Sequence, residues 1–370
     1  MVLLRGFMSP TTIRSVEIAN LDIPLLEPFG ISGGIQAAAN NVLLTVELSG
    51  GAVGLGEAAP LPPFNGETQA DALRALNTAR EWLVGRDAAS WRELGQELRV
   101  RANPASGSAL CALETALLDA LTREQGQSLR EFFGGADTSL ETDMTITTGT
   151  REQAGSAARL IRERGIRMIK VKVGGRAGPD HDLARIVAIR DAAPAAPLIL
   201  DGNAGLTRTD ARALIEGLKR HGITPELLEQ WLPKTDLDGM RALHEESGWL
   251  VAADEAVSSA ADAAGVVAAR AAQVINIKLM KGGIAAALDI AQVAREAGLG
   301  LMIGGNVESI LAMSTSAAFA VGTGGFRYAD LDTPLFLASN PFAGGFHQEG
   351  GILSLKHITA GHGVRLREGA

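Results

Sequence analysis

The sequence predicts an α/β protein whose main part is a parallel (β/α)-type barrel, accompanied by an accessory domain. Between residues 145 and 332, eight short apolar runs alternate with helical patterns, and successive runs end 24 to 29 residues apart. That spacing leaves room for one strand and one return helix in each repeat. At 370 residues the chain is also longer than a minimal barrel requires, so a second folded region is expected. The runs close, in order, on Thr145, Lys172, Asp201, Glu229, Asp254, Lys278, Gly304 and Asp330.

The regions flanking the barrel have a different pattern. Residues 11–60 are predicted to form strands around a turn at Gly50–Gly51, and residues 67–126 are predicted to form helices. Short β-like segments such as GILSLKH follow residue 341. Within residues 145–332, the apolar runs are nearly continuous, as expected for parallel strands covered on both faces.

The first predicted barrel helix has clear end signals. Thr150 and Gln153 could form a capping box at its start, and Gly165 follows its last turn. Gly222 and Gly298 end two later helices in the same way. Eight alternations favour a closed barrel over an open doubly wound sheet, and the catalytic rim of such a barrel lies at the carboxyl ends of its strands.

Three carboxylates end three adjacent predicted strands. Asp201, Glu229 and Asp254 close the third, fourth and fifth runs, so they converge on one arc of the rim. Any one of them alone would more often be a helix cap or a structural acceptor. Together, as oxygen ligands without His or Cys, they predict a site for a hard divalent cation, Mg²⁺.

Lysines close two strands that lie on opposite sides of the predicted barrel. Lys172 ends the second run and Lys278 ends the sixth, and Lys170 shares a face with Lys172. A lone lysine is usually a solvated surface charge, but these interrupt or end apolar runs. The arrangement suits removal and return of a proton next to a carboxylate, with the cation stabilising the enolate. We expect a lowered pKa for a lysine beside that cation. One lysine on each face of the carbon predicts racemisation or epimerisation.

Composition excludes several classes of function. The net charge of −8 without a basic cluster argues against a nucleic-acid partner. Cys111, the single cysteine, is predicted to be buried and cannot form a disulfide within the chain. No apolar run is long enough to span a membrane, and MVLLRGF is too short for a signal peptide. The expected location is the cytoplasm.

The chain resembles the muconate-lactonising subgroup of the enolase superfamily. The resemblance is carried by KVK at 170–172, LDGNAG at 200–205, EQ at 229–230, ADE at 253–255 and NIKLMKGG from residue 276. It implies a (β/α)7β TIM-like barrel with an α+β capping domain, divided as 1–134 (cap), 135–340 (barrel) and 341–370 (a tail that returns to the cap). It also implies a homo-oligomer. The implied roles are Mg²⁺ ligands for Asp201, Glu229 and Asp254, an acid/base pair for Lys172 and Lys278, and a substrate-carboxylate contact for Lys170.

The last predicted strand narrows the resemblance to one activity. RYADLD places Asp330 and Asp332 on one face, which resembles the Asp-x-Asp signature of the dipeptide epimerases. There the two acids bind the free α-ammonium of the substrate, which needs counter-charges beside a dication and lysines. An Asx turn or a cap is the structural alternative. Thr145 matches a threonine that touches the substrate carboxylate.

Two predicted capping loops and one barrel loop bear on specificity. Gly34 stands where some dipeptide epimerases carry an arginine that pairs with a glutamate side chain, and no cation within residues 27–36 replaces it. Phe64 would complete the lid, and Asn306 stands where relatives often have Met. We therefore expect a dipeptide substrate with a neutral or apolar side chain. N-acylamino-acid racemase, o-succinylbenzoate synthase and cycloisomerase of the same subgroup are the alternatives.

A non-catalytic barrel is the alternative from another class. Gly304–Gly305 and Gly324–Gly325 could present backbone N–H groups to a small anion such as phosphate. Glycine pairs are weak signals, because most of them mark turns.

Overall fold

The barrel predicted from the sequence is present. The structure, a computed structural model, describes residues 9–31, 34–102 and 104–369. Its largest sheet has eight parallel strands in which neighbours in space are also consecutive along the chain. They are β5 (Met144–Ile146), β6 (Ile169–Lys172), β7 (Leu198–Asp201), β8 (Leu227–Glu229), β9 (Val251–Ala253), β10 (Val274–Lys278), β11 (Gly300–Gly304) and β12 (Phe326–Ala329).

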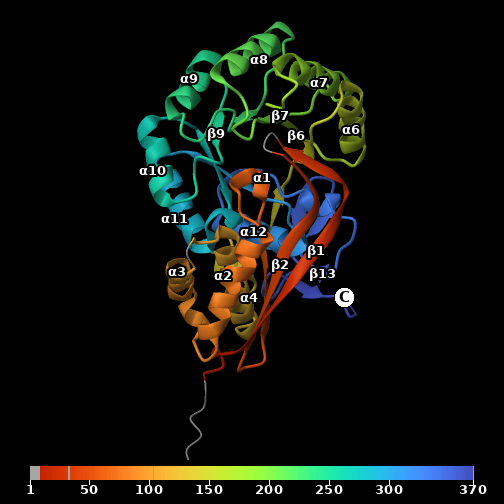
Figure 1. Cartoon of the computed structure of the whole chain (residues 1–370). Helices are drawn as coiled ribbons and strands as arrows, with labels where there is room; N and C mark the ends of the chain where they lie inside the picture. The colour runs from red at the N-terminus through yellow and green to blue at the C-terminus, as the bar shows by residue number, and fades with distance from the viewer. Residues whose placement is uncertain (1–8, 32–33, 103, 370) are drawn as a thin grey trace, which may run out of the picture.

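Seven helices link these strands and lie outside them, and α6 to α11 follow an outer arc (Figure 1). They are α6 (Arg151–Glu163), α7 (Pro179–Ala192), α8 (Arg208–Arg220), α9 (Leu237–Ser247), α10 (Ala260–Ala269), α11 (Gly283–Glu296) and α12 (Ile310–Thr323). A short 3₁₀ turn, η2 (Leu279–Lys281), precedes α11, and another, η3 (Thr333–Phe336), follows β12 in place of an eighth helix. The (β/α)7β prediction is therefore confirmed for the described part of the chain.

The two ends of the sheet meet through hydrogen bonds around β5 and β12. The backbone N–H of Asp143 donates to Ala329 O at 2.9 Å, and that of Leu331 donates to Thr142 Oγ1 at 2.9 Å. A small apolar cluster fills the barrel interior, and several of its members lie two residues before a functional strand end, on the same face. The cluster is Ile199, Leu227, Ala252, Val274, Met302 and Tyr328.

The N-terminal region forms an antiparallel sheet with helices packed beside it (Figure 1). Its elements are β1 (Ile13–Ile31), β2 (Gly34–Leu48), β3 (Val53–Ala58), α1 (Pro62–Asn65), α2 (Gln69–Leu83), η1 (Ala88–Ser90), α3 (Trp91–Arg101), α4 (Gly107–Glu124) and α5 (Leu129–Phe132). Helix α4 packs directly on β3, where a Cβ at Gly56 would meet Ala112 O at 2.0 Å. Only glycine permits this approach.

The C-terminal tail packs against both regions. Its strands are β13 (Phe342–Gly344), β14 (His347–Glu349), β15 (Ile352–Ser354) and β16 (Val364–Leu366), and β15 pairs with β4 (Ser139–Glu141). Arg123 on α4 donates from Nη2 to Val364 O at 2.7 Å. His362 Nε2 lies 3.1 Å from Leu55 O on β3. These contacts join the tail to the N-terminal region.

Local sequence signals agree with the structure to within a residue. The side chains of Thr150 and Gln153 form the predicted capping box of α6. Strands β9 and β12 end one residue before Asp254 and Asp330, and β5 ends one residue after Thr145. Cys111 is buried and free. In the described ranges, no helix combines the length and the apolar character needed to cross a membrane.

Candidate active site

The strand register places a lysine and two acids side by side at the barrel mouth. Lys172 is the Cα partner of Asp201, which is in turn the partner of Glu229. Asp254 comes directly after the next strand, β9, and its backbone N–H donates at 2.9 Å to Oε1 of Gln230. The side chain of Gln230 thus takes the place of a strand partner and fixes the loop that carries Asp254.

Lys170 bridges two of the acids from below the mouth. Its Nζ lies 3.0 Å from Asp201 Oδ2 and 3.0 Å from Glu229 Oε2. Lys172 donates from Nζ to the same Asp201 oxygen at 2.6 Å. Lys170, Asp201 and Glu229 are all completely buried. The predicted metal ligands are therefore a compact group of buried charges compensated by ammonium groups.

The third acid contacts a second pair of lysines. Asp254 Oδ2 lies 2.8 Å from Lys278 Nζ, and Asp254 Oδ1 lies 3.1 Å from Lys281 Nζ. Asn276 donates from Nδ2 to Glu229 Oε1 at 2.8 Å. The sequence analysis did not single out Lys281 or Asn276. Asn276 could have been found, because it lies two residues before Lys278 and therefore on the same strand face.

Lys172 and Lys278 line one cavity from strands that three others separate. The cavity holds about 350 Å³ of empty space, and Thr145, Asp330 and Asp332 also line it. Phe64, on α1 of the N-terminal region, covers it: its ring centroid lies 4.3 Å from Lys278 Nζ. The two ammonium groups therefore reach a common space from opposite sides, as the sequence predicts.

The protein's own groups raise the pKa of Lys278 and of Lys170, opposite to the lowering expected for a lysine beside a bound cation. Burial alone would lower the pKa of Lys278, but the negative charge of Asp254 outweighs burial and raises it. The pKa of Lys170 is raised in the same way by Asp201 and Asp330. The expectation counted the positive charge of a cation and not the negative charge of the ligands that would hold it.

The acids at the mouth differ in their protonation. Burial raises the pKa of Glu229 to about 7, and the neighbouring charge of Asp201 adds to this effect. Burial also opposes ionisation of Asp254, but Lys278 and Lys281 outweigh it and lower its pKa. Glu255, beside Asp254, has its pKa raised to about 8, mainly by burial. Glu229 and Glu255 are therefore partly protonated near neutral pH, whereas Asp254 is ionised.

Strained backbone lies directly after the ligand-bearing strands. Among the described non-glycine residues, φ is positive at Asn203 (41°), Ala204 (58°), Gln230 (37°) and Arg270 (53°). Three of these four follow Asp201 or Glu229 within three residues. Such conformations cost free energy, and they persist where the surrounding structure holds a functional side chain in place.

Asp330 and Asp332 lie on the same side of the cavity, and each uses one oxygen within the barrel. Asp330 Oδ2 lies 2.5 Å from Lys170 Nζ, and Asp332 Oδ2 accepts a hydrogen bond from Thr145 N at 2.6 Å. Asp332 precedes η3 but makes no side-chain cap. The alternative of a simple helix cap therefore does not account for Asp332.

The remaining predicted substrate residues lie at different distances from the cavity. Asn306 lines it and donates from Nδ2 to Ala59 O at 2.9 Å, which ties the barrel to the N-terminal region. Gly34 lines a neighbouring cavity instead, together with Thr148 and the exposed Arg176. Part of the loop 27–36, residues 32–33, lies outside the described residues.

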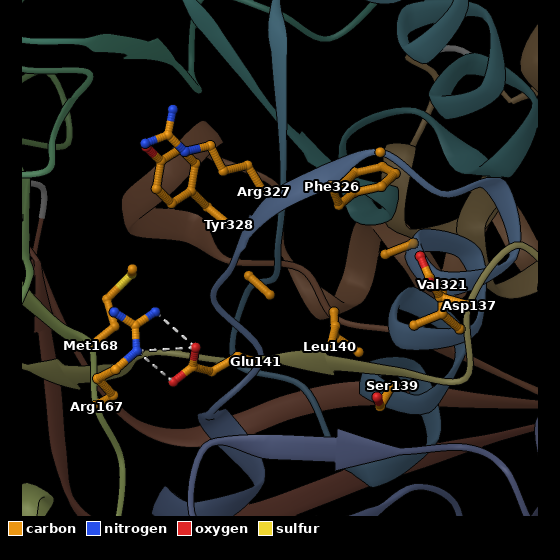
Figure 2. A pocket seen from close by; sticks show the side chains of 13 residues that line it. Asp137, Ser139, Leu140, Glu141, Arg167, Met168, Val321, Phe326, Arg327 and Tyr328 are labelled. Carbon is orange, nitrogen blue, oxygen red and sulfur yellow. Dashed lines mark hydrogen bonds and ion pairs between the residues drawn. The ribbon is translucent and has the colours of Figure 1, made fainter.

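A third cavity lies at the amino-terminal end of the strands and is not an anion site. Figure 2 shows Arg167 joined to Glu141, with Nη2 and Oε2 2.8 Å apart. The other arginine there, Arg327, pairs with Glu226 at 2.7 Å. At the glycine pair Gly304–Gly305, which lies elsewhere, a Cβ on Gly305 would lie 2.9 Å from Glu308 Oε1. The cations are neutralised and one glycine pair faces an acid, so the anion-binding alternative finds no support.

Both parts of the chain match a known family. Residues 13–134 match the mandelate racemase/muconate lactonizing enzyme N-terminal domain, and residues 152–370 match the enolase C-terminal domain-like family. An aromatic dipeptide epimerase from Herpetosiphon aurantiacus is 50% identical over 96% of this chain and 99% of its own length. A hydrophobic dipeptide epimerase from Citrifermentans bemidjiense is 34% identical, with coverages of 96% and 98%.

A solved structure has the same architecture. The dipeptide epimerase of Enterococcus faecalis, crystallised with Mg and L-Leu-L-Tyr, superposes with a TM-score of 0.90 at 30% identity, covering 95% of this chain and 99% of the other. Three findings indicate the same family: the sequence resemblance, the residues at the eight strand ends, and the matches over both regions. The chain belongs to the mandelate racemase/muconate lactonizing enzyme family of the enolase superfamily.

Proposed function

We propose that the protein is a Mg²⁺-dependent dipeptide epimerase that inverts the α-carbon of the C-terminal residue of its substrate. The observation that carries the proposal is the placement of Lys172 and Lys278 on opposite sides of one cavity, beside three buried acids. The named relatives act on dipeptides. The proposal accounts for both the position of the two lysines and the activity named for the relatives.

The donor set fits a hard divalent cation. Asp201, Glu229 and Asp254 offer only carboxylate oxygens, which Mg²⁺ prefers. Glu229 Oε2 and Asp254 Oδ2 are buried and accept no hydrogen bond of good geometry. Their contacts are with the ammonium groups of Lys170 and Lys278. When bound, Mg²⁺ would supply the positive charge that stabilises an enolate and favours a neutral lysine.

The two lysines would carry the proton. In one direction, Lys172 Nζ takes the proton from the α-carbon while Lys278 Nζ donates a proton to the opposite face, and in the other direction their roles exchange. One C–H bond breaks and one forms, so the net reaction is inversion without loss of any group. A positioned acid and base of this kind typically contribute about 10²- to 10⁴-fold each to the rate.

The acids at the end of β12 favour a substrate with a free ammonium group. Asp330 and Asp332 add negative charge to a cavity that already contains two lysines. An N-acylated amino acid has no positive end to place there, whereas a dipeptide has one. This argues for dipeptides over the acyl substrates of other branches of the family.

The cavity favours a neutral or apolar side chain. Leu61 and Phe64 supply apolar surface to the cavity, and the ring of Phe64 lies beside Lys278. The names of two relatives specify aromatic and hydrophobic dipeptides. We therefore expect L-Ala-L-Phe to be epimerised faster than L-Ala-L-Glu. The homo-oligomeric state stays a prediction.

A deuterium-exchange screen tests the proposal. A library of L,L-dipeptides and N-acetyl amino acids is incubated with the enzyme and Mg²⁺ in D₂O, and the mass of each compound is followed. We expect a gain of one deuterium in apolar dipeptides, and loss of this exchange in the double variant Asp330→Asn, Asp332→Asn. Exchange confined to the N-acetyl amino acids would overturn the assignment.

A further inference from the structure

A third buried acid lies beside Asp330 and Asp332 and takes part in none of the steps above. Asp143 immediately precedes β5, and its side chain is completely buried. Neither Oδ1 nor Oδ2 has a hydrogen-bond partner among the described residues. Native proteins pair almost all buried polar groups, so a buried acid without a partner is unusual.

The three carboxylates are close enough to share one ligand. One oxygen each of Asp143, Asp330 and Asp332 lies within 4.8 Å of the other two. For three atoms at this spacing there is a point that lies within about 2.8 Å of all of them, which is the length of a charge-assisted N–H···O hydrogen bond. Asp332 Oδ1 is, like both oxygens of Asp143, buried without a partner.

Among the described residues, the acids of this cluster have one ammonium group in contact with them. Lys170 contacts Asp330, but the same ammonium also serves Asp201 and Glu229. Asp143 does not line the cavity, whereas Asp330 and Asp332 do. The cluster therefore begins at the cavity wall, with Asp330 and Asp332, and continues into the buried interior of the barrel, where Asp143 lies.

We propose that Asp143 is the third carboxylate of a pocket for a primary ammonium group. An ammonium group has three N–H donors, and the cluster offers one acceptor oxygen from each of three acids. With one oxygen from each acid, Asp143 supplies the acceptor for the third donor. This inference rests on the proposed function only in that the N-terminal ammonium of a dipeptide would be the natural ligand.

Equilibrium binding of a dipeptide that cannot be epimerised tests the pocket. L-Ala-Gly has a free ammonium group but no stereocentre at its C-terminal residue, and N-acetyl-L-Ala-Gly lacks the ammonium. Calorimetric titration of the Mg²⁺-loaded enzyme compares the wild type with Asp143→Asn and with Asp289→Asn, a control on the exposed face of α11. We expect Asp143→Asn to weaken L-Ala-Gly at least about tenfold. Binding of the acetylated compound should change less than twofold, and Asp289→Asn should change neither.

The outcomes separate this inference from the proposed function. Equal weakening of both compounds would show that Asp143 is structural. No weakening, or no binding of L-Ala-Gly to the wild type, would also overturn the pocket. Should Asp143→Asn fail to fold, Asp143→Ser provides the same comparison. If the wild type binds L-Ala-Gly through Asp143 but exchanges no dipeptide proton in D₂O, the pocket stands and the proposed function fails.

Discussion

Two completely buried aspartates in this molecule have opposite surroundings. Asp119, on α4, accepts hydrogen bonds from Leu55 N at 3.0 Å, His362 N at 3.0 Å and Arg123 Nε at 2.9 Å. Asp143, directly before β5 in the barrel, accepts none from the described residues. One carboxylate joins the sheet, the helix and the tail of the capping region, whereas the other faces two more acids.

The difference distinguishes structural charge from ligand-binding charge. Burial would raise the pKa of Asp119, but His362 and Arg123 outweigh burial and lower it. Burial raises the pKa of Asp143 well above its ordinary range, and the charge of Asp330 adds to this effect. Native proteins pair almost all buried polar groups. A buried group without a partner therefore indicates a ligand site. Asp330 and Asp332, which lie beside Asp143, line the same cavity as the two lysines.

The largest effect is expected from Lys278→Ala, in the candidate active site. Removal of one proton carrier should lower the rate of epimerisation by about 10³-fold or more. Exchange of the α-proton of one epimer should persist through Lys172, measured by NMR in D₂O. Lys356→Ala, at an exposed position, is the control. Retained epimerisation in Lys278→Ala would contradict the role of the lysine pair.

In the paired region, Asp119→Ala should mainly reduce stability. It leaves Arg123 and the backbone of Leu55 and His362 without their acceptor, so we expect the free energy of unfolding to fall by about 3 to 5 kcal/mol. Urea denaturation measures this change. A loss of less than about 1 kcal/mol would show that pairing around Asp119 has little structural value.

The environment of Glu114 is intermediate between those of Asp119 and Asp143, and its contribution to stability depends on pH. It lies on α4, accepts a hydrogen bond from Ala285 N at 2.9 Å, and burial raises its pKa from 4.5 to about 7. The folded state thus holds the proton more tightly than the unfolded state, so stability falls as pH rises from 4.5 towards 7. The loss is up to about 3 kcal/mol.

Glu114→Gln removes that titration. The difference in unfolding free energy between variant and wild type should shift in favour of the variant between pH 5 and pH 8. Urea denaturation at both pH values measures the difference. A difference that is the same at both pH values would exclude the raised pKa.

The smallest effect is expected from Asp143→Asn, and its direction is opposite to that of Asp119→Ala. The raised pKa means that the ionised form of Asp143 is unfavourable in the folded state, whereas an amide is neutral and can donate a hydrogen bond to Asp330 or Asp332. We expect the free energy of unfolding to rise by about 1 kcal/mol. Thermal unfolding provides the measurement, and a clear loss of stability would show that Asp143 is already satisfied in the fold.

Much of the fold could be predicted because periodic apolar runs and helix ends are local signals. The positions of Lys172, Asp201, Glu229 and Lys278 at strand ends follow from that periodicity, and the strand register follows from the order of the repeats. The capping box of α6 is equally local. These features need no knowledge of distant contacts.

The rest depends on contacts between distant segments. Asp143 and Asp330 are 187 residues apart in sequence, and only the closure between β5 and β12 brings them together. The raised pKa of Lys278 reflects the short distance to Asp254, which spacing alone does not give. The position of Gly34 beside a different cavity depends on how the capping region lies on the barrel.

The account rests on proton exchange at one carbon of a dipeptide held between two lysines. Proton NMR of L-Ala-L-Phe with the wild-type enzyme and Mg²⁺ in D₂O tests it most directly. We predict that the α-proton signal of phenylalanine disappears and the L-Ala-D-Phe epimer accumulates, while the α-proton of alanine is retained. No exchange in this and other apolar dipeptides, or exchange at the alanine carbon instead, would contradict the account.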